Sequence, residues 1–261
     1  MIFLKLGGSL ITDKRLIETP RRDVIERLAR EISACIHNES SPVLLGHGSG
    51  SFGHATAKRY NTRAGVHDAA GWRGFAEVSV VAARLNRIVA DALLQAGISV
   101  VSIAPSATAI CRDGKLIEMD TRLIQSALEH GLAPLVMGDV ALDSVRGGTI
   151  VSTEEVFAYL AESLPVTRIL LAGETEGVYR NQQQQDVIPV ITPQSWHDVQ
   201  QGIGGSSGAD VTGGMASKVR DMLTLVSRHP GVRVQIFSAL QEGNLTRAWQ
   251  GEPIGTTILR A

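Results

Sequence analysis

The sequence predicts an α/β fold built on a mainly parallel sheet. Two observations support this prediction: short apolar, β-rich runs recur along the chain, and patterns with helical spacing lie between most of them. Such alternation is expected where strands are followed by helices that cross back over the sheet. The strand-like runs are 1–6, 43–46, 98–103, 133–137, 166–172 and 232–237.

Helical spacing is clearest in the segment 72–95, where Phe75, Val78, Ala82 and Leu85 recur three or four residues apart. An apolar stripe of this kind packs against a core. The same criterion predicts helices at 22–37, 121–130, 153–163 and 214–228. Two further segments, CRDGK and DSVRGG, have the composition of hairpin turns and predict antiparallel strands.

The composition excludes several classes of protein. With 261 residues, 44% of them hydrophobic, the chain can bury a large core. Its net charge of −1 leaves no basic excess for a nucleic-acid backbone or an anionic membrane. No apolar stretch approaches the ~18 residues that span a bilayer, and the N-terminus lacks a signal-peptide pattern. Cys35 and Cys111 lie outside any CxxC pattern, so we expect buried thiols in a cytoplasmic protein.

The first predicted strand ends in a glycine pair beside two lysines. Lys5 occupies the end of the strand, Gly7 and Gly8 follow it, and Lys14 lies beyond the turn. Glycines let the backbone approach an anion closely, and the lysines supply positive charge. A glycine pair by itself is equally typical of an ordinary turn.

A second glycine-rich segment, 46–54, follows the second predicted strand. Its glycines allow successive N–H groups to form an anion-binding nest. Gly48, Gly50 and Gly53 also match the GxGxxG pattern of dinucleotide-binding proteins. An NAD(P)-dependent oxidoreductase is therefore an alternative, but the acidic residue that should end the next strand is missing.

The third glycine loop contains the pair Gly213-Gly214, which opens the predicted helix that carries Lys218 about one turn further on. The free N–H groups and the positive end of the helix dipole favour an anion there, and the alternative is a capped helix with a solvated lysine. Together the three loops supply the groups that phosphoryl transfer needs, because positioning and charge stabilisation provide most of the catalysis of that reaction.

The order and spacing of six motifs resemble the amino acid kinase superfamily along nearly the whole chain and, within it, the isopentenyl phosphate kinases. The motifs are KLGGSLIT with Lys14, HGSGSFGHATA, Gly138-Asp139-Val140, Glu176-Gly177-Val178-Tyr179, DVTGGMASKV and Gly255-Thr256-Thr257-Ile258. The resemblance implies a three-layer αβα sandwich with a central, mainly parallel sheet, and a homodimer. It also implies one compact catalytic unit in which residues 1–165 bind the acceptor and residues 166–261 bind ATP.

Roles for individual residues also follow from the resemblance. Lys5 and Lys218 are expected to contact the transferring phosphoryl group, Lys14 to stabilise the transition state, and Asp139 to orient the lysines. The expected ATP-binding residues are Lys5, Gly7, Gly8, Ser9, Gly50, Glu174, Glu176, Tyr179, Gly213, Gly214, Met215 and Lys218. The expected acceptor-binding residues are Gly48, Ser49, Gly50, Gly53, His54, Ser152 and Thr153. Mg²⁺ is expected to be carried by the nucleotide, without protein ligands.

His54 indicates the acceptor class, because a histidine at the end of GSFGH implies, by the same resemblance, a phosphate or phosphonate acceptor. A phosphate monoester has a second pKa near ~6, so its attacking oxygen is ionised at neutral pH and needs no general base. We therefore expect His54 to bind and orient the acceptor, with helix capping as the alternative, and His47 to be structural.

The predicted activity is ATP-dependent phosphorylation of isopentenyl phosphate to isopentenyl diphosphate by in-line transfer. One alternative is a kinase that acts on fosfomycin or another small phosphonate or phosphate. An alternative of another class is a non-catalytic nucleotide-binding subunit of the same fold.

Three segments depart from the usual family pattern. Ser49 replaces the middle glycine of HGGGSFGH, which restricts the backbone if that position needs a positive φ. The usual Ser-Gly-Asp-Asp reads Ser152-Thr153-Glu154-Glu155, and the usual Asp-Val-Asp-Gly-Val-Tyr reads Glu174-Thr175-Glu176-Gly177-Val178-Tyr179. The apolar acceptor tail is expected beside the helix 72–95 and the hairpin near 138–152, against Val78, Val81, Ala82 and Ile150.

Overall fold

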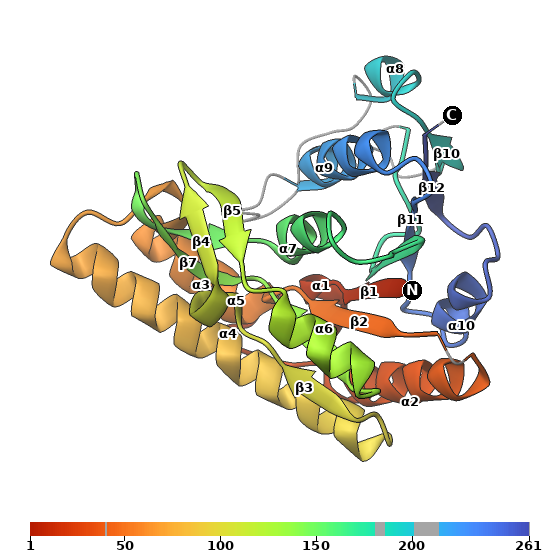
Figure 1. Ribbon diagram of the computed structural model, residues 1–261, viewed down its shortest axis with the longest axis horizontal. Coiled ribbons are helices and arrows are strands. Elements are labelled where there is room, and N and C mark those ends of the chain that lie inside the picture. Colours follow the sequence, from red (N-terminus) through yellow and green to blue (C-terminus); the bar gives the residue numbers. More distant parts are fainter. Residues whose placement is uncertain (40, 181–185, 201–213, 261) are drawn as a thin grey trace.

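The computed structural model describes residues 1–39, 41–180, 186–200 and 214–260. In this part of the chain, eight strands form one sheet in the order β10-β12-β11-β9-β1-β2-β6-β3 (Figure 1). Every neighbouring pair is parallel except β11 with β12. The strands are β1 (Ile2–Leu6), β2 (Val43–His47), β3 (Val100–Ser102), β6 (Ala133–Met137), β9 (Arg168–Gly173), β10 (Val190–Ile191), β11 (Arg233–Ser238) and β12 (Thr256–Ile258).

Helices cover both faces of this sheet, so two cores flank it. Phe3 of β1 packs into the core beneath the helices α6, α7 and α9, whereas Leu4 packs into the core beneath α2, α4 and α10. In Figure 1, α7 and α9 lie above the sheet, and α2 and α4 lie below it. The helices are α2 (Arg22–Asn38), α4 (Ala69–Gln95), α6 (Arg122–Glu129), α7 (Thr153–Leu160), α9 (Gly214–Arg228) and α10 (Asn244–Trp249). This arrangement confirms the predicted αβα sandwich.

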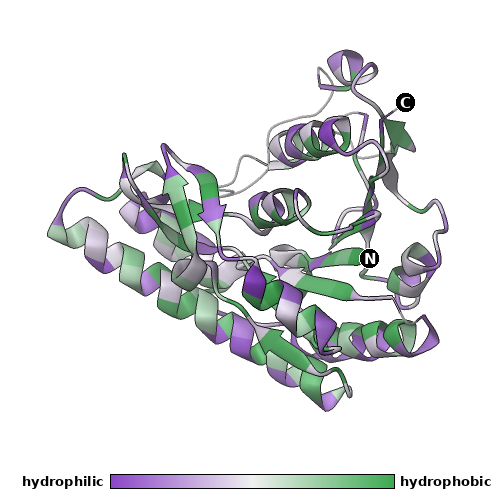
Figure 2. Cartoon of the chain, viewed as in Figure 1, coloured by the Kyte–Doolittle hydropathy of each residue, from purple (hydrophilic) through white to green (hydrophobic). Residues whose placement is uncertain are grey.

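The central strands are apolar throughout because both of their faces are buried. All residues of β1, β2 and β6 are buried, and β2 appears mostly green in Figure 2. Lys5, near the end of β1, is an exception to this apolar pattern. A buried charge requires a partner of opposite charge, so an acidic side chain is expected at this end of the sheet.

The two predicted hairpins form a separate small sheet, in the order β5-β4-β7-β8. Its strands are β4 (Ala109–Arg112), β5 (Lys115–Met119), β7 (Asp139–Asp143) and β8 (Gly147–Val151). Asp113 and Gly114 adopt positive φ in the first turn, and Gly147 does so in the second. The carboxylate of Asp143 accepts hydrogen bonds from amides in both turns, including those of Gly114 at 2.7 Å and Arg146 at 2.8 Å.

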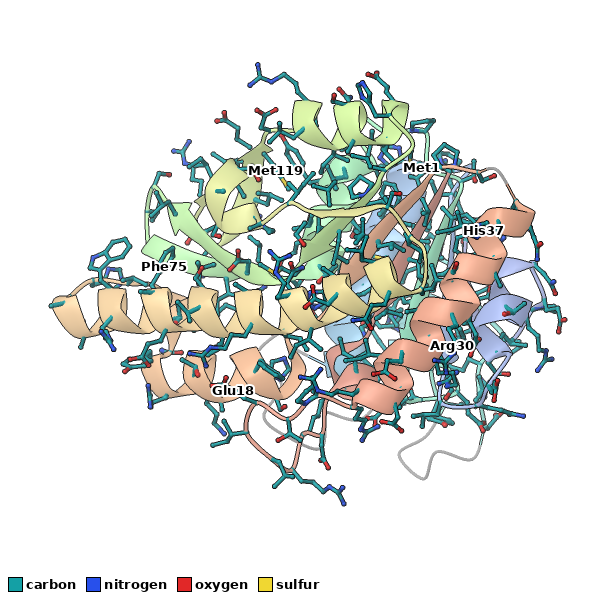
Figure 3. All side chains as sticks on the ribbon, turned by 90° about the horizontal axis from the view of Figure 1, so that it is seen from below. Met1, Glu18, Arg30, His37, Phe75 and Met119 are labelled. Carbon is teal, nitrogen blue, oxygen red and sulfur yellow. The ribbon has the colours of Figure 1, made fainter. Side chains whose placement is uncertain are left out.

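Several short elements complete the described chain: α1 (Gly8–Ile11), α3 (Gly50–Tyr60), the 3₁₀ turn η1 (Thr62–Ala64), α5 (Pro105–Thr108) and α8 (Trp196–Gln200). The helix α3 was not among the predicted helices, because the glycines at its start hide the helical pattern. The long helix α4 begins three residues earlier than predicted, where Asp68 caps it by accepting a hydrogen bond from Gly71 N at 2.7 Å. Figure 3 shows α4 and α2 crossing one face of the molecule.

Candidate active site

The first two predicted glycine loops meet at the carboxyl ends of β1 and β2, which are neighbours in the sheet. The turn after β1 is tied to β9, since Gly7 N donates to the Ala172 carbonyl over 2.7 Å. The turn after β2 is tied to β1, since Gly48 N donates to the Leu6 carbonyl over 2.9 Å. In open α/β sheets this edge is where ligands bind.

The glycines in these loops allow the two turns to touch. A Cβ atom on Gly8 would lie 2.4 Å from the Gly50 nitrogen, and one on Gly48 would lie 2.9 Å from the Gly8 nitrogen. Gly50 also has a φ of +49°. Larger residues would push the loops apart, so these glycines allow the two turns to pack against each other.

Ser49 fits the loop without strain. Its φ of −78° and ψ of −15° are ordinary right-handed helical values. The left-handed conformation that favours glycine falls instead on Gly50. Ser49 therefore replaces the usual family glycine at a position where the backbone does not require glycine. Within the described chain, the Ser49 amide donates to no protein group.

Lys5 and Lys218 share one carboxylate, that of Glu154. Lys5 Nζ forms an ion pair with Glu154 Oε2, and Lys218 Nζ lies 3.8 Å from Oε1. Lys5 and Glu154 are buried, whereas 31% of the Lys218 side chain is exposed. Burial by itself raises the pKa of Glu154, but the charges of the two lysines and the hydrogen bond from Lys5 outweigh it and lower the pKa to about 2. Glu154 is ionised at neutral pH, and it holds together two lysines from distant parts of the sequence.

Sequence reasoning missed Glu154 as a site residue. It sits in the first turn of α7, where Ser152 accepts a hydrogen bond from Glu155 N, and Glu155 accepts one from Ser152 N, in a reciprocal capping box. Thr153 anchors the same turn because its hydroxyl donates to the His47 carbonyl over 2.7 Å. The Ser-Thr-Glu-Glu segment signals a helix start, but nothing in it indicates which carboxylate faces the lysines.

These bonds give the side chains of Ser152 and Thr153 structural partners. Thr153 is almost completely buried, at 1% exposure. The hydroxyl of Thr153 is therefore engaged, whereas the hydroxyl of Ser152 only accepts and can still donate to a ligand. A contact of either residue with the acceptor stays a prediction.

Asp139 begins β7 and is also buried. Its carboxylate accepts hydrogen bonds from Ser106 N at 3.1 Å and from its neighbour Val140 N at 2.8 Å. Burial raises the pKa of Asp139, and these hydrogen bonds act in the opposite direction. The carboxylate seen to bridge the lysines is Glu154, and the orienting role predicted for Asp139 stays a prediction.

His47 is buried at the end of β2 and acts structurally in this region. Its Nδ1 donates to the Gly48 carbonyl over 3.1 Å, and its Nε2 accepts from the Asn86 side chain over 3.1 Å. This pair of bonds fits the neutral imidazole that carries its proton on Nδ1. Burial is the main reason that the pKa of His47 falls to about 4, and the nearby charge of Lys5 lowers it further.

Stability is expected to fall as the pH drops from 7 to 5. A pKa of about 4 in the folded chain, against a usual value of 6.5, means that the unfolded chain binds more protons in this range. The loss attributable to His47 is about 2 kcal/mol between pH 7 and pH 5. Urea unfolding at both pH values measures it, and His47→Gln should remove this part of the pH dependence. An unchanged slope in that variant would show that other groups cause it.

His54 and Lys14 each follow one of the two touching turns in the chain. His54 is the fifth residue of α3 and is half-buried, whereas Lys14 is exposed in the loop between α1 and α2. Gly53, the residue before His54, packs against Ser49, whose Oγ would be 2.5 Å from a Cβ there. The structure thus brings the residues predicted for the acceptor loop into one turn and the start of one helix.

The residues predicted for the nucleotide side lie beyond β9 and on α9. Glu174 forms an ion pair with Arg21 at 2.7 Å, and Tyr179 forms an isolated bridge with Val187. Gly214 begins α9 with a φ of +71°, and Met215 packs at the edge of the core. The predicted Gly213 lies outside the described residues. At the start of α1, the amides of Gly8 and Ser9 donate to no group in the described chain.

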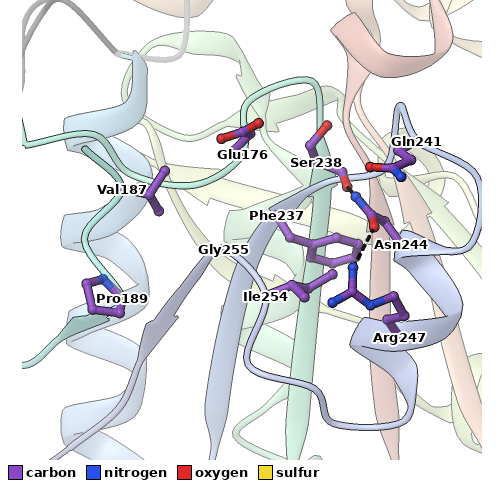
Figure 4. A pocket seen from close by; sticks show the side chains of 10 residues that line it. All are labelled: Glu176, Val187, Pro189, Phe237, Ser238, Gln241, Asn244, Arg247, Ile254 and Gly255. Carbon is purple, nitrogen blue, oxygen red and sulfur yellow. Dashed lines mark hydrogen bonds between the residues drawn. The ribbon is translucent and has the colours of Figure 1, made fainter. Parts of the chain in front are cut away.

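A pocket of about 380 Å³ opens at the ends of β9 and β11 (Figure 4). Glu176 and Val187 form one wall, and Ser238 and Asn244 form another. The Asn244 side chain donates to the Ser238 carbonyl over 3.0 Å, so this wall is fixed. The pocket lies two strands from Lys5 in the sheet order, which corresponds to about 10 Å at the usual strand spacing.

Comparison with known proteins identifies the family. A sequence profile of the amino acid kinase family matches residues 1–238. The chain belongs to the amino acid kinase family. The isopentenyl phosphate kinase of Methanothermobacter thermautotrophicus is 37% identical to the chain, over 99% of the chain and 98% of that protein. The isopentenyl phosphate kinase of Haloferax volcanii is 36% identical over the same shares of the two chains.

This amino acid kinase is also similar to solved structures of isopentenyl phosphate kinases. An X-ray structure of an isopentenyl phosphate kinase superposes with a TM-score of 0.84 and 33% identity, and the match covers 99% of both chains. In the described residues, no helix is both long and apolar enough to cross a membrane. No group of three or more His, Cys, Asp or Glu side chains in that part of the chain is arranged to hold a metal ion.

Proposed function

We propose that the chain transfers the γ-phosphoryl group of ATP to isopentenyl phosphate and forms isopentenyl diphosphate and ADP. The observation that carries this proposal is the carboxylate of Glu154 holding Lys5 and Lys218 beside the loop that leads to His54. Relatives named isopentenyl phosphate kinase, which align over 98% of their own length, support the choice of acceptor. No observation favours fosfomycin or a non-catalytic role.

The lysines would stabilise charge as the phosphoryl group passes between two anions. At neutral pH the attacking oxygen of a phosphate monoester is largely ionised, so no residue has to remove a proton. A lysine within ~4 Å of a phosphate oxygen contributes roughly 4 kcal/mol of attraction at an effective dielectric of about 20, before desolvation. Two or three lysines offset the mutual repulsion of donor and acceptor.

The nucleotide would extend from Lys5 across the end of β9. The amides of Gly8 and Ser9 would bind its phosphates, and its base would reach the pocket beside Glu176. Mg²⁺ bound to the phosphates supplies further positive charge.

The apolar tail of the acceptor would lie against a third, smaller core cluster. Ala57, Val78, Val140 and Ile150 form this cluster, with Phe75 packed at its edge. It lies between α3, which carries His54, and the small sheet. Two of the expected tail contacts, Val78 and Ile150, belong to it, whereas Val81 packs in the core between α2 and α4.

A coupled assay of ADP formation tests the function directly. Isopentenyl phosphate should support turnover with a KM well below that for fosfomycin, and labelled ATP should yield labelled isopentenyl diphosphate. Turnover with fosfomycin alone, or ATP binding without turnover on any phosphorylated alcohol, would contradict the proposal. A homodimer and a cytoplasmic location also remain proposals, which rest on the family resemblance, and light scattering would test the first.

Replacing His54 by Ala is expected to raise the KM for isopentenyl phosphate about 10- to 100-fold, because a hydrogen bond to a charged phosphate is worth about 1.5–3 kcal/mol. The KM for ATP should change little. His130→Ala, which removes an exposed histidine far along the chain, is the control. Unchanged acceptor kinetics in His54→Ala would show that this residue does not bind the acceptor.

A further inference from the structure

The loop that carries Lys14 is closed at its base. It runs between α1 and α2, and Asp13 N donates to the Thr19 carbonyl over 2.9 Å. A bridge between Thr12 and Pro20 lies directly before these residues. Lys14 itself is exposed. Its placement relative to the phosphate-binding turns therefore depends on the contacts that fasten the loop to the rest of the fold.

Ser51, the second residue of α3, binds the end of this loop at Glu18 and Thr19. Its carbonyl accepts a hydrogen bond from Glu18 N at 3.3 Å, and its hydroxyl accepts one from Thr19 N at 3.2 Å. Glu18, labelled in Figure 3, has a φ of +47°, which is uncommon for a residue other than glycine. The loop is thus attached to the helix that also carries His54.

The hydroxyl of Thr12 links this helix to the turn after β1. It donates to the Gly8 carbonyl over 2.6 Å and accepts from Ser51 N over 2.9 Å. Ser49 at the helix N-cap makes no side-chain capping bond, so Thr12 satisfies an amide that the helix itself leaves unpaired. A Cβ on Gly50 would lie 2.1 Å from the Thr12 oxygen, so the absence of a side chain at Gly50 makes room for the hydroxyl.

Thr12 and Ser51 are both buried, with exposed fractions of 0% and 7%. They join three parts of the site, namely the turn that would hold ATP, the helix that would hold the acceptor, and the loop that carries Lys14. We propose that Thr12 and Ser51 are positioning residues for phosphoryl transfer, acting through Lys14. This inference rests on the proposed function, because it assumes that Lys14 acts on the transferring group.

The physical reason is the sensitivity of the reaction to geometry. Phosphoryl transfer gains most of its rate from placement, and a displacement of about 1 Å can cost about 10²-fold. A lysine on an exposed loop samples many rotamers, so its rate contribution depends on how firmly its backbone is held. A buried hydroxyl that bonds two backbone groups holds the backbone of this loop more firmly than an exposed ion pair would.

The test compares hydroxyl-removing variants by kcat and KM. Thr12→Val keeps the volume of the side chain, and we expect its kcat to fall about 10- to 100-fold with both KM values within about threefold of the parent. Thr12→Ser should restore kcat to within about threefold. Ser51→Ala, which keeps the backbone bonds, should give a smaller loss of kcat. Ser33→Ala, which removes a buried hydroxyl from α2 distant from these loops, is the control and should leave kcat unchanged.

A double-mutant cycle then asks whether the effect passes through Lys14. Adding Thr12→Val, or Ser51→Ala if the first variant fails to fold, to Lys14→Ala should cause less than about a twofold further loss of kcat. A further loss as large as that in the parent, an unchanged kcat in both single variants, or a rise in KM alone would overturn the positioning role while leaving the proposed function in place. Failure of the unmodified chain to phosphorylate isopentenyl phosphate would overturn both.

Discussion

A Lys218→Ala variant is expected to turn over about 10²- to 10³-fold more slowly than the unmodified chain. Lys218 lies one turn inside α9 and shares Glu154 with Lys5, and 31% of its side chain is exposed. Its charge would act on the phosphoryl group as that group leaves the nucleotide. Because Lys5 still compensates the charge of Glu154, the loss in free energy of unfolding should be smaller than the loss caused by replacing Glu154 itself.

The measurement is kcat from initial rates at saturating ATP and isopentenyl phosphate. Arg220→Ala provides a matched control, since Arg220 is an exposed cation two residues further along the same helix. If both variants lose activity equally, the effect comes from the general charge of the helix. If Lys218→Ala keeps its full kcat, then Lys218 does not stabilise the transition state and the proposed mechanism must rely on the other lysines.

A Glu154→Gln variant is expected to lose both stability and activity. Removing one partner of a buried ion pair typically costs about 3–5 kcal/mol, because the other charge remains buried without compensation. Here that charge is Lys5, whose side chain is only 11% exposed. The lysines would also lose their shared anchor, so kcat should fall by about 10²-fold even under conditions where the variant is folded.

Glu154→Asp separates the two effects, because it keeps the charge but shortens the side chain by one methylene group. We expect it to recover most of the stability while kcat stays below that of the parent. Urea unfolding and initial rates at pH 7 measure both quantities. A Glu154→Gln variant with normal stability and normal kcat would show that the lysines do not depend on this carboxylate.

The same carboxylate makes an acid-sensitive contribution to stability. The pKa of Glu154 is about 2 in the folded chain, below its usual value of 4.5, so its contribution is complete above pH 4.5 and is lost as the pH falls toward 2. His47 acts at higher pH, between 6.5 and 4. Acid should therefore weaken the fold in two steps, the first of which leaves the triad of Glu154 and the two lysines intact.

Local patterns in the sequence were sufficient for most of the fold. Strands such as β1 and β6 are apolar along their whole length because they are buried on both faces, and α4 shows its stripe over many turns. Both hairpins carry the glycine that their turns require. The helix α3 escaped prediction because its glycine-rich start has low helical propensity and is stabilised by Thr12, a residue from another segment.

By itself, the sequence determined the fold class and predicted the glycine loops, the three lysines and His54 as site residues, because each depends on residue types that are adjacent or regularly spaced. Only the tertiary structure decided which carboxylate joins Lys5 to Lys218, and that a single threonine hydroxyl connects the turn after β1 to α3. These contacts bring together residues far apart in the chain. No local pattern specifies them, since they arise from the order in which β1, β2 and β9 pair and from the close approach that the glycines allow.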